Sequence, residues 1–433
     1  MLQTAHNNDG GGLDFILKRL SLFSYFNHSA VLPPQNLFKT AFIFILSCQL
    51  ANCTTCLGPT MKVRAVTIGL DLCGNDFSSI EILSKKILSV SASLDTIERH
   101  LLSDDYEVQT KRLSLNSFEL WLPRQADGTF DLKGVHEYIG LLLQCLATAN
   151  IAFCTIGCGT TKEGIDLLGE ILPLYSSLSS SALIQFDGHT PIVELAEAAA
   201  RIVRLLSTST PDGTANFRFC AAFNCPPNIP FFPVSYHEAG KAPTVTVGME
   251  CGDLLFLAFH GVTDLPQASR NLESAYTQLT QNLEATLIEA CALCGDGAVE
   301  YGGIDASMNP GLTIQDSVGL GFEQLPPFVF GSWGTLATAS TITRAIKSLK
   351  DKIKLVGYSG LMLPVMEDLT LAERAAEKKD RYCLRDLLLY SSVCGVGLDT
   401  VPVPGATSVD ELVRLYLDIG AMSHRLSKPL TCR

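Results

Sequence analysis

A cysteine and an aspartate lie five residues apart on a glycine-rich turn near the end of the chain. The segment S-V-C-G-V-G-L-D-T-V-P-V-P-G, residues 392–405, places Gly395 and Gly397 between Cys394 and Asp399. Glycine lacks a Cβ, so this turn can adopt a positive φ and approach another group closely. A thiol at the exposed tip of such a turn can act as a nucleophile when a cation or a helix N-terminus stabilises its thiolate. The alternative is a buried Cys394 that packs as a small hydrophobic residue.

Polar or ionisable side chains come after four segments that are expected to be strands. These segments cover residues 217–223, 299–304, 353–358 and 387–393. The polar residues beyond their ends are Tyr236, His237, Asp305, Ser307, Ser359, Glu367, Asp368, Cys394 and Asp399. In an α/β barrel and in a doubly wound sheet alike, ligands bind beyond the carboxyl ends of the strands. We therefore expect these side chains to form one pocket.

The residue types divide this set into two groups. Some carry groups that transfer protons or attack electrophiles, and others carry groups that hold a polar ligand. The predicted catalytic residues are Cys394, Asp399, His237 and Glu367, and the predicted substrate-binding residues are Asp305, Ser307, Ser359, Tyr236 and Asp368. Asp305 is also the candidate ligand of a divalent cation, which binds carboxylate oxygens. The structural alternative is that the aspartates cap helices or turns and that His237 is a structural residue of its proline-rich loop.

The elements that must position these residues alternate between strand-like and helix-like segments. A first strand is expected from Met61 and a buried strand over residues 151–156. The expected helices are residues 133–149, 160–178, 265–293 and 335–349. Helices of this length between strands favour crossover connections and a largely parallel sheet. We predict one large α/β barrel over residues 61–433, with a doubly wound sheet as the alternative.

Helix-capping signals define three further helix starts. Ser78 with Glu81, and Ser408 with Glu411, have the spacing of capping boxes, and the last helix is expected to run through His424. Thr190 is the predicted N-cap of another helix, with Pro191 at its first position.

The composition excludes several classes of function. Apolar residues make up 47% of the 433 residues, the net charge is −12 and the mean hydropathy is +0.24. A chain this acidic, without a basic cluster, is not expected to bind nucleic acid or an anionic membrane surface. The sequence contains no nucleophile elbow, P-loop, zinc-protease motif or dinucleotide fingerprint, so no nucleotide cofactor is predicted. The expected partner is a small-molecule ligand, and a homo-oligomer is compatible with the sequence.

The cysteines and the first 60 residues bear on the compartment and on the extent of the domain. Fifteen cysteines in a chain of this length do not resemble a disulfide framework, so a reducing, cytoplasmic compartment is expected. The pair Cys53/Cys56 and the pair Cys291/Cys294 lack zinc-finger partners, and the second pair is expected to be buried at a helix end. The apolar run at 41–47 is too short for a stable membrane span. Residues 1–60 are expected to be a disordered or non-native extension.

The chain resembles an uncharacterised family, catalogued as domain of unknown function 711 and also called the UPF-zero-two-ten proteins. The resemblance runs from about Met61 to the C-terminus. The segments that carry it are residues 218–237, 303–307, 357–368 and 393–405 and the K-P-L-T segment at 428–431. It implies the α/β barrel of pyruvate formate-lyase-like glycyl radical enzymes, in which a finger loop carries a catalytic cysteine. Cys394 is the candidate for that place.

Two departures from this pattern limit what the resemblance implies. The C-terminal region has no R-V-x-G-Y-like segment to hold a glycyl radical, so radical chemistry is not expected, and a fold alone does not confer it. Relatives continue past the K-P-L-T segment with a Pro- and Gly-rich tail, so a C-terminal truncation is expected. The predicted function is acid/base, thiol or metal-assisted chemistry on a small polar metabolite. The alternative is a non-catalytic protein that binds a metabolite on an enzyme-like fold.

Overall fold

The computed structural model describes residues 62–295, 298–325, 328–377 and 381–433. The expected N-terminal extension and the Cys53/Cys56 pair lie outside the described residues. The strands are β1 (Lys62–Leu70), β2 (Glu107–Val108), β3 (Lys111–Leu115), β4 (Phe153–Gly159), β5 (Leu178–Leu183), β6 (Phe186–Asp187), β7 (Thr190–Pro191), β8 (Phe219–Phe223), β9 (Thr244–Glu250), β10 (Glu300–Asp305), β11 (Gly397–Leu398) and β12 (Leu430–Cys432).

Ten of these strands form one mixed, mostly parallel sheet. Its order is β10-β9-β1-β3-β4-β5-β8-β12-β11, and β2 pairs with β1. The five strands from β1 to β8 are parallel to one another. The direction reverses between β1 and β9 and again between β8 and β12. The expectation of a largely parallel α/β sheet is confirmed.

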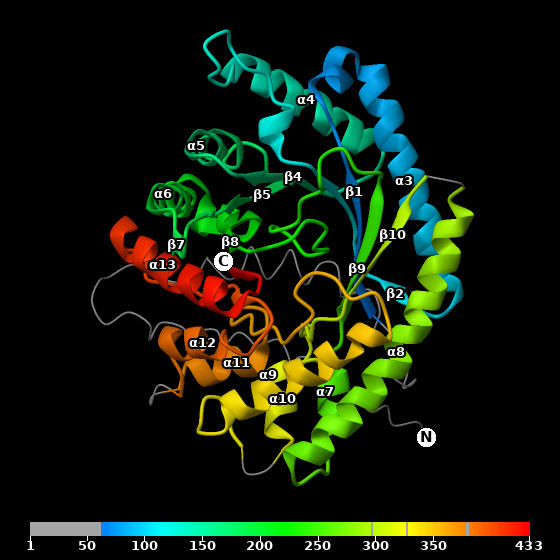
Figure 1. Ribbon diagram of the computed structural model, residues 1–433, viewed down its shortest axis with the longest axis vertical. Coiled ribbons are helices and arrows are strands. Elements are labelled where there is room, and N and C mark those ends of the chain that lie inside the picture. Colours follow the sequence, from blue (N-terminus) through cyan, green and yellow to red (C-terminus); the bar gives the residue numbers. More distant parts are fainter. Residues whose placement is uncertain (1–61, 296–297, 326–327, 378–380) are drawn as a thin grey trace, which may run out of the picture.

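Helices lie around the outside of this sheet (Figure 1). They are α3 (Ile80–Ser103), α4 (Leu132–Thr148), α5 (Lys162–Ile171), α6 (Val193–Ser209), α7 (Gly252–Phe259), α8 (Leu265–Leu293), α9 (Val318–Glu323), α10 (Thr335–Lys347), α11 (Leu369–Ala375), α12 (Leu384–Tyr390) and α13 (Val409–Leu426). Each longer helix buries one apolar face, as Leu83, Ile87, Leu94 and Ile97 do on α3. The predicted bounds of α8 match the structure, and α5 ends at Ile171, earlier than expected.

Two irregular segments, residues 354–362 and residues 395–396, connect the free edges of the sheet through backbone hydrogen bonds. Residues 354–362 form parallel bridges to β10 at Ile304 and to the following loop at Met308. On its other side the same segment accepts a hydrogen bond of 2.7 Å from the Gly395 N–H to the Leu361 carbonyl. The Thr431 N–H in β12 then donates to the Val396 carbonyl at 2.7 Å. The segment expected as a strand at 353–358 is therefore paired, although it forms no regular strand.

Two predicted helix starts are wrong and one is confirmed. Helix α3 is capped by Ser79, whose hydroxyl accepts from the Ile82 N–H, because Ser78 ends a preceding 3₁₀ turn. Thr190 and Pro191 form β7 of a short hairpin, and helix α6 starts after Ile192. Ser408 and Glu411 form the predicted capping box of α13.

The apolar run before Cys394 is helix α12, which contradicts the expected strand. Its apolar residues Leu387 and Tyr390 are buried at helical spacing, whereas Leu389 is 50% exposed. A short apolar run fits a buried strand and a helix equally well by composition, and tertiary packing decides between them. Cys394 thus lies after a helix end rather than a strand end.

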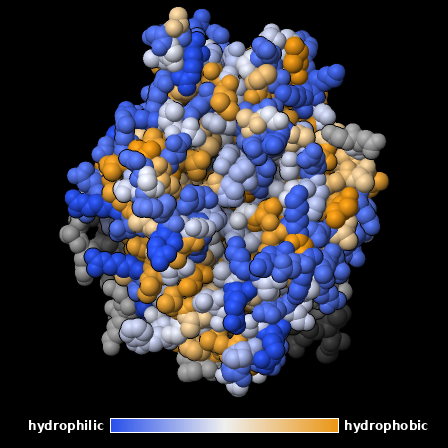
Figure 2. Space-filling view, viewed as in Figure 1, coloured by the Kyte–Doolittle hydropathy of each residue, from blue (hydrophilic) through white to orange (hydrophobic). Residues whose placement is uncertain are grey.

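The surface of the protein is mixed in polarity. On the face shown in Figure 2, hydrophilic residues predominate and hydrophobic residues lie in small groups. Within the described ranges, every helix is too short or too polar to span a bilayer.

Candidate functional site

Arg64 reaches the interior of the fold from an irregular position in β1. The pairing of β1 with β9 shifts register between Val63 and Ala65, so Arg64 has no partner in that ladder. Such bulges bend the strand and re-aim the side chain. The Arg64 guanidinium donates to Glu250 at 3.0 Å and to Glu367 at 2.9 Å.

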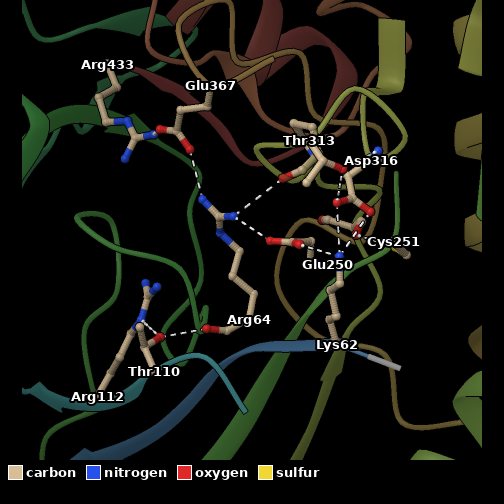
Figure 3. A network of polar contacts seen from close by, with 12 residues as sticks. Lys62, Arg64, Thr110, Arg112, Glu250, Cys251, Thr313, Asp316, Glu367 and Arg433 are labelled. Atoms are coloured by element: carbon tan, nitrogen blue, oxygen red, sulfur yellow. Dashed lines mark hydrogen bonds and ion pairs between the residues drawn. The ribbon is translucent and has the colours of Figure 1, made fainter. Parts of the chain in front are cut away.

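The guanidinium of Arg433 contacts two carboxylates, those of Glu367 and Asp399. Its Nη2 lies 2.6 Å from Glu367 Oε1 and 2.9 Å from Asp399 Oδ1, and its Nη1 donates to the Phe232 carbonyl at 3.3 Å. Figure 3 shows Glu367 between Arg433 and Arg64. All of these side chains are at most 23% exposed. Charge-assisted contacts of this length are among the stronger interactions in proteins.

The two carboxylates experience different electrostatic surroundings. Burial alone would raise the pKa of Glu367, but Arg433, Arg64 and Arg112 outweigh burial and hold that pKa below its usual range. Burial raises the pKa of Asp399 above its usual range, and the nearby Glu367 charge adds to this effect against the opposing pull of Arg433. The pair therefore combines an ionised carboxylate with one that binds a proton more readily.

Arg112 is the cation of this group that lacks a carboxylate partner among the residues that the structure describes. Its Nε donates to Thr110 Oγ1 at 2.8 Å, and its guanidinium carbon lies 5.2 Å from the ring centre of Phe232 and 5.7 Å from that of Phe153. Burial and the charges of Arg64 and Arg433 lower the pKa of Arg112 to about 9, so the group stays cationic at neutral pH. Its terminal nitrogens are free to bind an anion.

A cavity of about 110 Å³ lies where these side chains meet. Its polar lining includes Arg64, Arg112, Arg433, Glu367, Asp399 and Asn309. Its apolar lining includes Phe231, Phe232, Met362 and Val396. Charged side chains therefore converge on this cavity beside a few apolar ones, an arrangement that suits a small charged ligand.

A comparison with known protein families identifies the family of this chain. The family model described as Uncharacterised ACR (DUF711) matches residues 58–433. The chain belongs to the DUF711 family. The match covers all four segments and the K-P-L-T motif on which the resemblance was based.

Curated relatives of this DUF711 protein carry the name UPF0210 protein. One from Pyrobaculum arsenaticum is 30% identical over 244 residues, which cover 55% of this chain and 52% of that relative. One from Clostridium perfringens is 23% identical over 405 residues, with 84% and 82% covered. One from Neisseria meningitidis serogroup B is 24% identical over 411 residues, with 86% and 84% covered. The chain thus spans about half the length of the first of these relatives.

Among solved structures, the DUF711 chain is similar to the anaerobic ribonucleotide reductase from Thermotoga maritima, determined in complex with dATP and CTP. The similarity covers 94% of this chain and 71% of the reductase, with 10% sequence identity and a TM-score of 0.31. A score this low carries no argument about mechanism.

Of the residues predicted from the sequence, Glu367 and Asp399 line the cavity of this DUF711 protein. They come from the segment after residues 354–362 and from the turn after β11, so sequence positions far apart do meet here. The roles predicted for the two carboxylates stay predictions.

Asp305, Ser307 and Ser359 form a separate buried cluster. The Asp305 carboxylate accepts hydrogen bonds from Ser307 Oγ at 2.6 Å and from the backbone N–H groups of Ser307, Tyr358 and Ser359 at 2.8–3.0 Å. These donors occupy both carboxylate oxygens of Asp305. Within the described residues, no group of three or more His, Cys, Asp or Glu side chains could hold a metal ion. The geometry thus fits a structural carboxylate better than the predicted metal ligand.

Asp368 caps helices instead of lining the cavity. It is the N-cap of α11, where it accepts from the Leu371 N–H at 3.0 Å. It also accepts from Ser317 Oγ and the Val318 N–H, both at 2.7 Å, at the start of α9. This is the structural alternative that the sequence left open for the aspartates.

His237 and Tyr236 lie away from the arginines. The His237 ring contacts Asn228 Oδ1 at 3.0 Å and the Lys241 carbonyl at 3.2 Å, and it packs against Gly69. Gly69 is near the far end of β1 from Arg64, about 16 Å along the strand. Burial lowers the pKa of His237, and Tyr236 donates to the Cys225 carbonyl at 3.0 Å. The expected convergence of these two residues with Glu367 and Asp399 is wrong.

Cys394 is buried, which contradicts the expected exposed thiol. It is 1% exposed and packs in the main hydrophobic core, while its carbonyl accepts from the Lys428 ammonium. Residues 395–398 connect this cysteine to Asp399. Its predicted catalytic role remains untested.

The arginines at the cavity were not among the residues predicted from the sequence. Arg64 and Arg112 lie in the first half of parallel strands, whereas the predicted site residues all come after the ends of expected strands. A detectable signal was present: K-V-R at 62–64 and K-R at 111–112 place cations inside strands that are otherwise buried. Charged residues inside such strands need buried partners or a ligand.

Proposed function

We propose that this cavity binds a small carboxylate metabolite and that Asp399 and Glu367 form an acid/base pair toward it. The observation that carries the proposal is Arg112, a half-buried guanidinium at the cavity without a carboxylate partner in the described chain. Arg64 and Arg433 are paired with Glu250, Glu367 and Asp399. Within the described chain, the guanidinium of Arg112 is therefore the group left for a monoanion to neutralise.

The size and polarity of the cavity favour a short organic acid. The cavity volume of about 110 Å³ is smaller than that of a drug-sized pocket, so the ligand is a short acid. The apolar side chains Phe231, Met362 and Val396 offer contacts to a carbon skeleton, which an inorganic anion would not use. Arg112 supplies planar donors that suit a carboxylate.

The acid/base part of the proposal rests on the shared guanidinium. Glu367 Oε1 and Asp399 Oδ1 both contact Arg433 Nη2, so the two carboxyl groups are close neighbours. Glu367 has a second cation in Arg64, whereas Asp399 has only Arg433 within ion-pair distance in the described chain. Carboxyl pairs whose pKa values are separated by their surroundings act as acid and base. Asp399 is the proton donor and Glu367 the ionised partner.

The fold that surrounds the site is, in this proposal, a closed barrel. The hydrogen bonds between β10 and residues 354–362, from Gly395 to Leu361 and from Thr431 to Val396 support closure of the sheet. In this ring, β1, β3, β4, β5 and β8 make one parallel half, and β9, β10, residues 354–362, β11 and β12 make the other. Kinship with the glycyl radical enzyme barrel is part of this proposal.

The alternative is a non-catalytic protein that binds the same ligand. Two observations favour this alternative. The Cys394 thiol is buried, and both carboxylates are already engaged by Arg433, so none of the three groups is free to react. Conversion of a bound acid to product would support the enzyme, and binding without conversion would support the binding protein.

Replacing Arg112 with glutamine is expected to weaken the binding of small carboxylates by tenfold or more, because the guanidinium is their charged partner. Calorimetric titration with acetate, propionate and butyrate would measure the effect. Arg124→Gln is the matched control, since Arg124 also stacks on an aromatic ring, Phe130, but pairs with Glu163 away from the cavity. Equal affinity in the Arg112 variant and the wild type would contradict the proposal.

Anion binding is expected to strengthen as the pH falls through the raised pKa of Asp399 in the folded protein. Protonation of Asp399, whose pKa is raised, removes a negative charge beside the cavity, whereas Glu367, whose pKa is lowered, stays ionised. Removing one like charge at this range should raise the affinity about tenfold. Methanesulfonate is the suitable probe because its own charge is constant. Asp399→Asn should bind it at pH 7 as tightly as the wild type does at the lower pH, and a persisting pH dependence would assign the titration elsewhere.

The raised pKa of Asp399 also makes the stability of the folded protein depend on pH. Because the pKa of Asp399 is higher in the folded protein, the folded state holds more protons between the two pKa values. The contribution of Asp399 to stability is therefore present at low pH and lost as the pH rises through the folded-state pKa.

A further inference from the structure

A second cavity of about 110 Å³ is lined by Glu250, the carboxylate that accepts from Arg64. It is bounded by the start of β1, the end of β9 and helices α7 and α8. Most of its lining is apolar, from Val63, Tyr106, Met249, Leu254, Leu279 and Leu283. Three charged residues, Lys62, Glu250 and Asp253, also line it.

A chain of alternating charges links the two cavities. Glu250 accepts from Arg64 at 3.0 Å and lies 3.5 Å from Lys62 Nζ. Lys62 in turn donates to both oxygens of Asp316, at 3.0 and 3.1 Å. Figure 3 shows this series continuing from Glu367 through Arg64 to Asp316. Lys62 is thus neutralised within the chain and is not available to an anion in the second cavity.

Asp253 is the unmatched charge of the second cavity, as Arg112 is of the first. Its Oδ1 accepts from the Leu254 N–H at 2.8 Å, and no ion pair joins it to a cation within the described residues. Burial and the neighbouring Asp316 raise the pKa of Asp253, while the Lys62 charge opposes them less strongly. The simpler interpretation is that Asp253 only stabilises the N-terminus of α7, where it occupies the first turn.

We propose that the second cavity binds a small alkylammonium ion, with its ammonium group at Asp253 and its alkyl chain among the apolar residues. The local charge supports a cation, because Asp253 and Asp316 face Lys62 alone, and Glu250 is shared with Arg64. The volume of about 110 Å³, smaller than that of a drug-sized pocket, suits a short alkyl chain. Burial of the alkyl chain among these apolar side chains would add to the ion pair. The proposal does not depend on the function of the first cavity.

Calorimetric titration of the full chain with n-butylammonium at neutral pH would test this site. We expect binding at millimolar or lower concentration, weakened about tenfold in Asp253→Asn because the ammonium loses its ionic partner. 1-Butanol, which has the same alkyl chain without the charge, should bind at least about tenfold more weakly than the amine. Arg112→Gln should leave amine binding unchanged, which separates failure of this site from failure of the first.

Asp410→Asn is the matched control. Asp410 also lies in the first turn of a helix, α13, but on the exposed surface away from both cavities. Amine binding that stays at the wild-type level in this variant and falls in Asp253→Asn supports the site. Equal binding in Asp253→Asn and the wild type, equal binding of butanol and butylammonium, or no binding at all would overturn it and leave Asp253 as a helix-terminal residue only.

Discussion

Replacing Glu367 with glutamine is expected to lower the free energy of unfolding by about 3–5 kcal/mol, the cost of breaking a buried ion pair from one side. Glu367 contacts Arg433 at 2.6 Å and Arg64 at 2.9 Å, and its side chain is 16% exposed. Arg112 adds a third positive charge that acts on the same carboxylate. The amide keeps the shape but removes the charge, so three half-buried guanidinium groups would face Asp399 and Glu250 alone.

Urea denaturation at neutral pH would measure this change, with the wild type as reference. Glu377→Gln is the matched control because Glu377 also joins two arginines, Arg374 at 3.0 Å and Arg381 at 2.5 Å. These groups are more exposed, at up to 46%, so this change should cost no more than about 1 kcal/mol. A similar small loss for both variants would mean that solvent screens the Glu367 cluster as well, and the picture of a desolvated charge group would be wrong.

The fold class could be predicted from the sequence because hydrophobic periodicity records which faces are buried. The long helix α8 and the capping box of α13 were predicted at their observed positions. The order and direction of the strands could not be predicted, since β9 runs antiparallel to β1 only through pairing between residues about 180 positions apart. Short strands such as β11 and β12 exist through such pairing and leave little local signal.

The candidate site was predicted only in part, for a related reason. Glu367 and Asp399 were identified because they come after apolar segments, and both line the cavity. Their cations were missed because ligand-binding residues were expected at only one end of a parallel sheet. In this mixed sheet, the reversal at β9 brings Glu250, at the end of that strand, next to Arg64, at the start of β1. A site built at such a reversal needs the topology before its residues can be grouped.

The glycine-rich turn shows where composition alone was informative. Its glycines were expected to allow a positive φ and a close backbone approach, and both expectations are confirmed. Gly397 has a φ of 103°, and Gly395 lies against the backbone of Gly360. The expected exposure of the thiol is wrong, because Cys394 is buried, and its catalytic role stays a prediction. The turn presents Val396 and Asp399 to the cavity, so its contribution lies in positioning these residues.

Replacing Gly395 with alanine is expected to destabilise the protein by about 3 kcal/mol, at the upper end of the usual cost of overpacking. A Cβ at this position would lie 2.7 Å from both the Cα and the carbonyl carbon of Gly360, and backbone atoms cannot rotate away. The added methyl group would push apart the two segments that the 2.7 Å hydrogen bond from Gly395 to Leu361 joins. Thermal and urea denaturation would measure the loss.

Gly405→Ala is the matched control on the same segment, because a Cβ there meets no atom within 4 Å. It should change the stability by less than about 0.5 kcal/mol. The Gly395 variant should also bind small carboxylates more weakly, since Met362 and Val396 line the cavity on the two segments that the alanine separates. Wild-type stability and affinity in Gly395→Ala would mean that these segments move apart freely, and the proposed closure of the barrel at this junction would then have no structural role.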